Sequence, residues 1–313
     1  MSKATPRFTP PSGIRTRLSL FGKALSKELK ASGKPIATAY DIFQEMRALY
    51  ASDRKLMLRK KLPDHDELDK VRRQLMDANV LDNDEDFKQN TYRIISNGDG
   101  SAEDVCCIAD RFCFISHLSA MARYGLTDRR PHILQLTAPN PKILHKFVGE
   151  TLQSDYGAET LLTLEEDQIV KPPARTKFPG KVRGREVSVM QSAHPGASQQ
   201  LRGCFSRIGT IGQVFASMLE EPDLCGGMKH VLEIWQEHAQ IYLDDIIEAI
   251  GSRPKGITKV RAGYILDELI GIEDPRIEQW TRHAQRGSSR LLNPSATYES
   301  KFSEKWMLSL NVN

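Results

Sequence analysis

Four side chains that could hold a metal ion lie close together in the middle of the chain: Cys106, Cys107, Cys113 and His117. Zinc prefers thiolate and imidazole ligands, but structural zinc sites arrange them at short characteristic spacings, and this spacing matches none of them. Cysteine is also among the residue types that are most often buried. We therefore expect buried, reduced thiols, no metal and no cofactor, with His117 as a capping or core polar residue.

An acidic run at 82–86 begins like the calcium loop of an EF-hand. That loop needs glycine at its sixth position and glutamate at its twelfth, where this chain has Phe87 and Arg93. The sequence also contains no Walker A motif, no His-Glu-x-x-His, no Gly-x-Ser-x-Gly and no Cys-x-x-Cys. These patterns predict that the chain is not an enzyme.

Basic side chains give the clearest sign of a partner. The chain has 44 Lys and Arg against 40 Asp and Glu, yet residues 1–61 hold 14 basic and only 4 acidic side chains. This asymmetry is typical of a module that binds nucleic acid, although a solvated basic tail would give the same count. The predicted DNA-binding residues are Arg15, Arg17, Thr38, Lys55, Arg59, Lys60, Lys61, Lys70, Arg72 and Arg73.

The elements that would position these residues follow from apolar spacing and turn signals. Apolar residues three and four apart predict a helix over 17–30, and a short strand is expected at 35–37. Thr38 caps a second helix, Asp64 opens a third, and a hairpin with a polar tip follows over 79–95. This is the order of a winged helix-turn-helix, which we prefer to a generic helical bundle because a bundle does not explain the hairpin.

The chain is long enough for two domains with separate cores. We place the winged helix-turn-helix at 1–97, with 1–14 as a flexible arm, and a glycine-containing linker at 97–101. The second domain, 101–313, mixes strand and helix patterns, so the fold class is α/β (α+β).

Within the second domain, residues 112–115 predict a buried strand, Ser116 caps a helix, and Gly125 ends that helix. Further strands are expected at 132–137 and 186–190. Helices are expected at 210–219, 228–250 and 258–270, the last capped by Thr258.

The sequence of residues 115–127, ISHLSAMARYGLT, resembles the hallmark "ISHLSAL-x-x-x-GLT" of AbiEi-type antitoxins, transcriptional regulators of bacterial AbiE (type IV) toxin–antitoxin operons. Residues 221–227 are similar to the family's "RP-x-x-x-GG" break, and 260–267 to its "RR-x-GYLLE" helix. Residues 286–294, 304–306 and 310–312 resemble its closing segment. Two departures stand out: Ala262 replaces the second arginine of the pair, and only Thr210 remains of an Arg-Thr motif.

The resemblance implies a DNA-binding autorepressor that binds inverted repeats in its own promoter. It also implies an antitoxin that counteracts a nucleotidyltransferase-like toxin in a system tied to phage defence. Residues 171–203 hold seven basic side chains and one acidic one, and Lys177, Lys181, Arg183 and Arg185 are the candidates for contact with the toxin or its nucleic acid. A solvated loop with incidental charge explains the same count.

Two other functions stay open at this point: a stand-alone winged-helix regulator without a toxin partner, and a nucleic-acid-processing enzyme. Residues 287–289 (Gly-Ser-Ser) lack the paired aspartates of a nucleotidyltransferase, so the chain does not resemble the toxin itself. No run approaches the roughly 18 apolar residues of a membrane helix, and no secretion signal is visible. We therefore expect a cytoplasmic protein.

Overall fold

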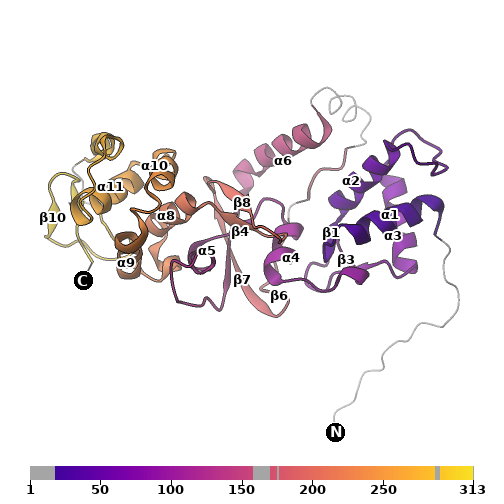
Figure 1. Ribbon diagram of the computed structural model, residues 1–313, viewed down its shortest axis with the longest axis horizontal. Coiled ribbons are helices and arrows are strands. Elements are labelled where there is room, and N and C mark those ends of the chain that lie inside the picture. Colours follow the sequence, from indigo (N-terminus) through magenta and orange to yellow (C-terminus); the bar gives the residue numbers. More distant parts are fainter. Residues whose placement is uncertain (1–17, 158–169, 175, 286–289, 313) are drawn as a thin grey trace, which may run out of the picture. The chain divides into compact units, whose positions relative to one another are not determined.

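Figure 1 shows the computed structural model of the chain, which describes residues 18–157, 170–174, 176–285 and 290–312. The chain divides into two compact units, and the division falls between Asp99 and Gly100. Residues 170–174 belong to the first, N-terminal unit. Both units contain helices and strands, so the mixed α/β class is confirmed.

The N-terminal unit contains three helices and a small antiparallel sheet. The helices are α1 (Leu20–Ala31), α2 (Ala39–Tyr50) and α3 (His65–Asp77). The strands are β1 (Ile36–Thr38), β2 (Leu81–Asn83) and β3 (Thr91–Ile94), paired in the order β1-β3-β2, and a short 3-10 turn, η1 (Ile95–Asn97), follows. The helices, the short strand and the hairpin expected from the sequence are therefore present in the expected order.

Local sequence signals fix where these helices begin. The side chains of Ser19 and Asp64 accept backbone N–H groups at the starts of α1 and α3, at 3.0 and 2.9 Å. Thr38 and Asp41 form a reciprocal capping box on α2, in which each side chain accepts the other residue's backbone N–H. Each cap satisfies donors that a helix leaves without partners, a contribution of about 1 kcal/mol.

One apolar cluster lies between the three helices and the sheet. Leu25, Ile42, Phe43, Met46 and Leu75 are fully buried in it. Burying each side chain of this size contributes about 1.5–3 kcal/mol. Because the cluster draws only on residues before Asp99, the N-terminal unit has a hydrophobic core of its own.

The hairpin tip is held by one of its own acidic residues. Asp84 is buried, and its carboxylate accepts the backbone N–H groups of Asp86 and Phe87 at 3.1 and 2.9 Å. Phe87 is buried as well. The run 82–86 was expected to be a polar tip, and most of it is exposed, but Asp84 serves the fold of the turn.

The C-terminal unit contains a six-stranded mixed sheet in the order β6-β7-β5-β4-β9-β8. Its strands are β4 (Phe114–Ile115), β5 (Leu134–Pro139), β6 (Lys181–Val182), β7 (Arg185–Ser192), β8 (Ser198–Gln200) and β9 (Arg207–Gly209). β5 pairs with β7 and β4 with β9 in parallel, and the other neighbours are antiparallel. A small hairpin, β10 (Phe302–Ser303) and β11 (Leu308–Ser309), lies near the end of the chain.

Helices flank the sheet and extend beyond it (Figure 1). They are α4 (Ala102–Ala109), α5 (His117–Arg123), α6 (Pro141–Tyr156), α8 (Ile211–Glu220), α9 (Met228–His238), α10 (Leu243–Gly251), α11 (Gly256–Tyr264) and α12 (Pro275–Glu278). Shorter elements are the 3-10 helices η2 (Pro222–Cys225) and η4 (Gln279–His283) and the π-helix η3 (Ile265–Leu269). The strand and the helix expected around Ser116 are present, and Gly125 has the left-handed φ of +70° that ends many helices.

Two helix predictions were wrong in detail. The single helix expected over 228–250 is two helices, α9 and α10, because each packs against a different part of α8. Trp235 of α9 contacts Phe215, whereas α10 approaches Gly212 so closely that a Cβ there would lie 2.1 Å from a backbone oxygen of α10. Thr258 is not an N-cap, since α11 begins two residues earlier and the Thr258 hydroxyl donates to Glu220 at 3.4 Å.

None of the helices in the described part of the chain is both long and apolar enough to cross a membrane.

Candidate nucleic-acid interface

Helix α3 has one buried face and one charged face. Leu68, Val71 and Leu75 are buried against the core of the N-terminal unit. Lys70 and Arg73 are exposed on the other side, where the Arg73 Nε donates to a backbone carbonyl one turn earlier at 3.2 Å. Both cationic head groups therefore remain accessible to a polyanion.

Arg72, the third basic residue of α3, is committed to the fold. Its guanidinium donates to the Tyr92 hydroxyl at 2.6 Å, lies 5.4 Å from the centre of that ring and pairs with Asp69 at 3.3 Å. These contacts join α3 to strand β3. Because the guanidinium has partners on two elements, we expect Arg72 to orient α3 rather than to hold a phosphate.

The basic connector between α2 and α3 contains two kinds of cation. Lys60 pairs with Asp64, the N-cap of α3, and this hydrogen bond raises the pKa of the lysine and lowers that of the aspartate. Lys55, Arg59 and Lys61 are exposed and form no ion pair with any residue that the structure describes. These three keep their full charge available to a partner.

The connector and α3 meet at a cavity of about 280 Å³ in the N-terminal unit. Arg59 from the connector and Lys70 from α3 both line it, so these cations share one side of the unit. The sequence separates them by eleven positions and gives no sign that they lie together. Their juxtaposition is the geometric feature that sequence reasoning missed.

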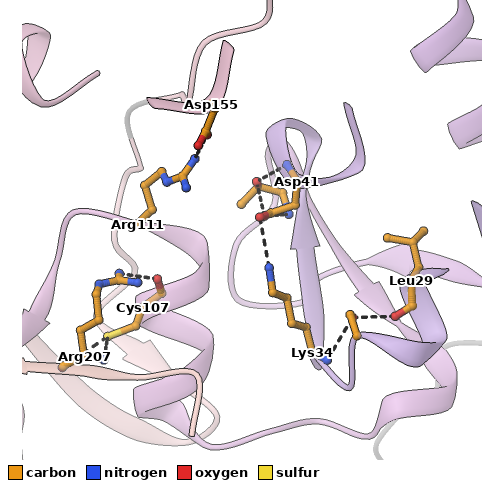
Figure 2. A network of polar contacts seen from close by, with 9 residues as sticks. Leu29, Lys34, Asp41, Cys107, Arg111, Asp155 and Arg207 are labelled. Carbon is orange, nitrogen blue, oxygen red and sulfur yellow. Dashed lines mark hydrogen bonds and ion pairs between the residues drawn. The ribbon is translucent and has the colours of Figure 1, made fainter. Parts of the chain in front are cut away.

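The remaining predicted DNA-binding residues fall into two groups. Thr38 is half-buried, and its hydroxyl and backbone N–H both donate to the Asp41 carboxylate, which also pairs with Lys34 at 3.4 Å (Figure 2). The hydrogen-bonding groups of Thr38 thus serve the start of α2. Arg15 and Arg17 lie outside the described residues.

The candidate basic residues of the C-terminal unit have different surroundings. Lys177 is exposed before β6, and Lys181 on β6 pairs with Glu186 at 3.7 Å. Arg183 lies in the turn to β7 with a left-handed φ of +49°. Arg185 is half-buried and pairs at 3.0 Å with Glu103, a buried carboxylate that also pairs with Arg123. Arg185 therefore stabilises the C-terminal unit itself.

The cysteines lie where the fold needs small apolar side chains. Cys106, Cys107 and Cys113 are buried, as expected, and Cys107 accepts the backbone N–H of Arg207 at 3.4 Å. The Arg207 guanidinium donates to the backbone carbonyl of Cys107 at 2.6 Å (Figure 2). It also donates to the backbone carbonyls of Asp110 and Cys113, at 2.8 and 3.1 Å. Arg207 thereby joins the end of α4 to β9, and no metal-holding group of acidic, Cys or His side chains occurs among the described residues.

His117 is a core residue with unusual surroundings. It is 1% exposed, has a left-handed φ of +50°, and its Nδ1 lies 2.8 Å from the Ser116 hydroxyl. Its Nε2 has no hydrogen-bond partner among the described residues. Burial lowers the pKa of His117 from 6.5 to about 4, so the ring is neutral at physiological pH.

Comparison with known proteins adds little at this point. No protein-family model and no curated protein matches the chain. Among solved structures, the RV2827C protein from Mycobacterium tuberculosis is similar over 93% of this chain and 92% of that one, with 14% sequence identity and a TM-score of 0.45.

Proposed function

We propose that the chain is a cytoplasmic DNA-binding transcriptional regulator whose N-terminal unit is a winged helix-turn-helix. The order of its elements supports this reading, because three helices are followed by the β2–β3 hairpin and β1 adds a third strand. In such domains the last helix before the hairpin enters the major groove. That helix is α3, which exposes Lys70 and Arg73.

The observation that carries the proposal is the grouping of accessible cations. Arg59 and Lys70 line one cavity, and neither forms an ion pair within the described residues. Phosphate contacts dominate the affinity of a protein for DNA, and they need cations whose charge is not already paired. The connector and α3 together meet that need.

The first experiment measures binding of the full chain to its own upstream DNA as a function of salt. A triple variant, Arg59→Gln with Lys70→Gln and Arg73→Gln, removes three phosphate contacts. Each contributes about 0.9 to the slope of log affinity against log salt, so the slope should fall by roughly 2.7 and the affinity by roughly 150-fold to 200-fold at about 0.15 M salt.

The matched control changes three exposed lysines of α1: Lys23→Gln, Lys27→Gln and Lys30→Gln. These lysines lie on the exposed face of α1, away from its buried residues. The control therefore removes the same amount of positive charge from residues outside the proposed interface. Control affinity within about threefold of the wild type supports the assignment. An equal loss of affinity in the two triple variants would mean that binding depends only on total positive charge, and the proposed interface would be wrong.

We also propose that the C-terminal unit is of the AbiEi antitoxin type and counteracts a nucleotidyltransferase-like toxin. Two of the family-like patches pack against each other, since a Cβ on Gly263 would lie 2.2 Å from the Trp306 ring. Arg261, in the same patch as Gly263, donates to the Leu219 carbonyl at 2.8 Å, which closes the end of α8. The resemblance thus rests on residues that pack within the fold. It supports a shared architecture more than shared contacts with a toxin.

The antitoxin proposal is tested by growth rescue with the full chain. The neighbouring toxin gene is expressed from an unrelated promoter, so repression of the native operon has no effect. The Arg59, Lys70 and Arg73 triple variant should still rescue growth if neutralisation acts on the toxin. A wild-type chain that fails to rescue growth in this assay would mean that it does not act on the toxin, which is the result expected of a stand-alone regulator.

The basic residues of the C-terminal unit can be tested in the same assay. Lys177→Ala with Lys181→Ala changes two exposed lysines, and Arg185→Ala is left out because it would leave the buried Glu103 short of a partner. Unchanged rescue in this double variant would mean that these lysines are solvated surface charges with no part in neutralisation.

A further inference from the structure

The cavity between the connector and α3 has the features of a small-molecule site. Its volume of about 280 Å³ is near the lower end of the range of small-molecule sites, roughly 300–1,000 Å³, and it opens to solvent. Its lining combines residues from the start of α1, the end of α2, the connector and α3. Four chain segments thus converge on it.

Much of the wall and rim is apolar. Phe21, Leu56, Leu58 and Val71 supply the wall, and Phe21 meets the Tyr50 ring edge to face at 5.4 Å. Leu20 at the rim is 55% exposed. Covering exposed apolar surface at the mouth of a cavity with an apolar ligand removes that surface from water, which favours binding.

Met57 adds an exposed apolar side chain to the lining of the cavity. Its side chain is 83% exposed, and its φ of +56° is in the left-handed region that a long unbranched side chain rarely adopts. Such a conformation costs about 1–3 kcal/mol, which the surrounding structure must offset. Here it places a flexible apolar side chain at the cavity mouth.

The polar groups of the cavity favour an anion. Arg59 and Lys70 both line it and have no ion pair within the described residues. Glu67 is the one acidic residue of the lining, and its carboxylate already accepts the Tyr50 hydroxyl at 2.7 Å. The lining therefore offers two unpaired cations against one hydrogen-bonded carboxylate.

We propose that this cavity binds a small amphipathic anion, an aromatic carboxylate whose rings lie against the apolar wall and whose carboxylate contacts Arg59 and Lys70. Carboxylate and guanidinium match in geometry and charge, and the apolar wall selects against hydrated inorganic anions. Neither cation has an ion pair within the described residues, so both can be replaced without removing an ion pair from the fold.

The ligand would also act as an effector of DNA binding, a step that rests on the proposed function. Arg59 and Lys70 belong to the interface proposed above, so one carboxylate bound between them removes two phosphate partners. Because the coupling between two binding sites is reciprocal, the ligand lowers the affinity for DNA by the same factor by which DNA lowers the affinity for the ligand. Loss of two phosphate contacts corresponds to a decrease in affinity of roughly thirtyfold to fiftyfold at about 0.15 M salt.

Binding is tested first without DNA, on the full chain, by equilibrium dialysis against 2-naphthoate. Its neutral analogue, 2-naphthalenemethanol, has the same rings and nearly the same size. We expect 2-naphthoate to bind at least about tenfold more tightly than the alcohol. In Arg59→Gln with Lys70→Gln, this preference should disappear, while the affinity for the alcohol changes little.

The matched control is Lys61→Gln with Arg73→Gln, two exposed cations of the same segments that do not line the cavity. It should retain the preference for 2-naphthoate. Leu58→Trp, which fills the cavity from the connector, should abolish binding of both compounds. Equal affinity for the acid and the alcohol, or an equal loss in both double variants, would overturn the site.

The coupling is tested by titrating 2-naphthoate into the complex with upstream DNA. Release of DNA from the wild type, with DNA retained by Leu58→Trp, supports the effector role. Binding of 2-naphthoate without release of DNA would overturn that role alone. A chain that binds 2-naphthoate but no DNA would overturn the proposed function and leave the cavity assignment intact.

Discussion

His117 allows a prediction whose sign and size both follow from the fold. The ring is almost fully buried, and burial lowers its pKa from 6.5 to about 4. In the unfolded chain the ring regains water and titrates near 6.5. Between these two pH values the unfolded chain binds a proton that the folded chain does not, so the free energy of unfolding falls as the pH is lowered.

The size of the effect can be worked out from the two pKa values. At pH 8 both states are neutral at this ring, and the residue adds no pH dependence. At pH 5 most unfolded chains are protonated at His117 and most folded chains are not, which costs the folded state about 2 kcal/mol. The loss continues through pH 4, where half of the folded chains are protonated at this ring, and is complete about one pH unit lower.

The variant to compare is His117→Asn. Asparagine tolerates the left-handed φ of +50° better than most residues and does not titrate. Its own effect on packing is the same at both pH values, so it cancels when the change between pH 8 and pH 5 is compared. His145→Asn, at an exposed position of α6, serves as the control for removal of a histidine.

The assay is urea unfolding followed by tryptophan fluorescence. All three tryptophans, Trp235, Trp280 and Trp306, lie in the C-terminal unit, so the signal reports the unit that contains His117. From pH 8 to pH 5 the wild type and His145→Asn should lose about 2 kcal/mol more than His117→Asn. The same loss in all three proteins would refute the reasoning, because it would mean that His117 is protonated in the fold.

Three further results are expected. Arg207→Gln removes a guanidinium that donates to three backbone carbonyls, and it should lower the free energy of unfolding by about 2–4 kcal/mol in the same fluorescence assay. Gly263→Ala places a methyl group against the Trp306 ring and should cost about 2 kcal/mol or more, with a shift of the emission maximum. In the salt titration of DNA binding, Lys70→Gln should reduce the slope by about 0.9 and Lys60→Gln by much less, because only Lys60 is already paired.

The features that could be predicted from the sequence are those that depend on neighbouring residues. Thr38, Asp64 and Gly125 lie where the caps and the helix end were expected, because a cap needs only donors within one turn. The apolar stripes of α1, α2 and α3 were equally visible, since helical spacing places them on one face.

The features that were missed depend on distant parts of the chain. Nothing local divides 228–250 into two helices; the break follows from the close approach of α10 to Gly212. Thr258 has the residue type of a cap, but its hydroxyl donates to Glu220, 38 residues away. Arg185 looked like a surface cation, and only the fold places Glu103 beside it.

A count of basic residues in the sequence overestimates how many are available to bind DNA, because the fold gives some of them partners. Of the ten predicted DNA-binding residues, Arg15 and Arg17 lie outside the described part, and Thr38, Lys60 and Arg72 have partners within the N-terminal unit. The exposed cations that remain are Lys55, Arg59, Lys61, Lys70 and Arg73.

If each of these five cations meets one phosphate, they contribute about 4.5 to the salt slope for each chain bound. Residues 1–61 have an excess of ten basic residues (14 basic less 4 acidic). If each of these met one phosphate, the salt slope would be about 9, twice as large. A measured slope close to the larger value would mean that the paired cations exchange their carboxylate partners for phosphates. A slope close to the smaller value would mean that the ion pairs of the free chain persist on DNA, and that the fold has already selected which cations bind.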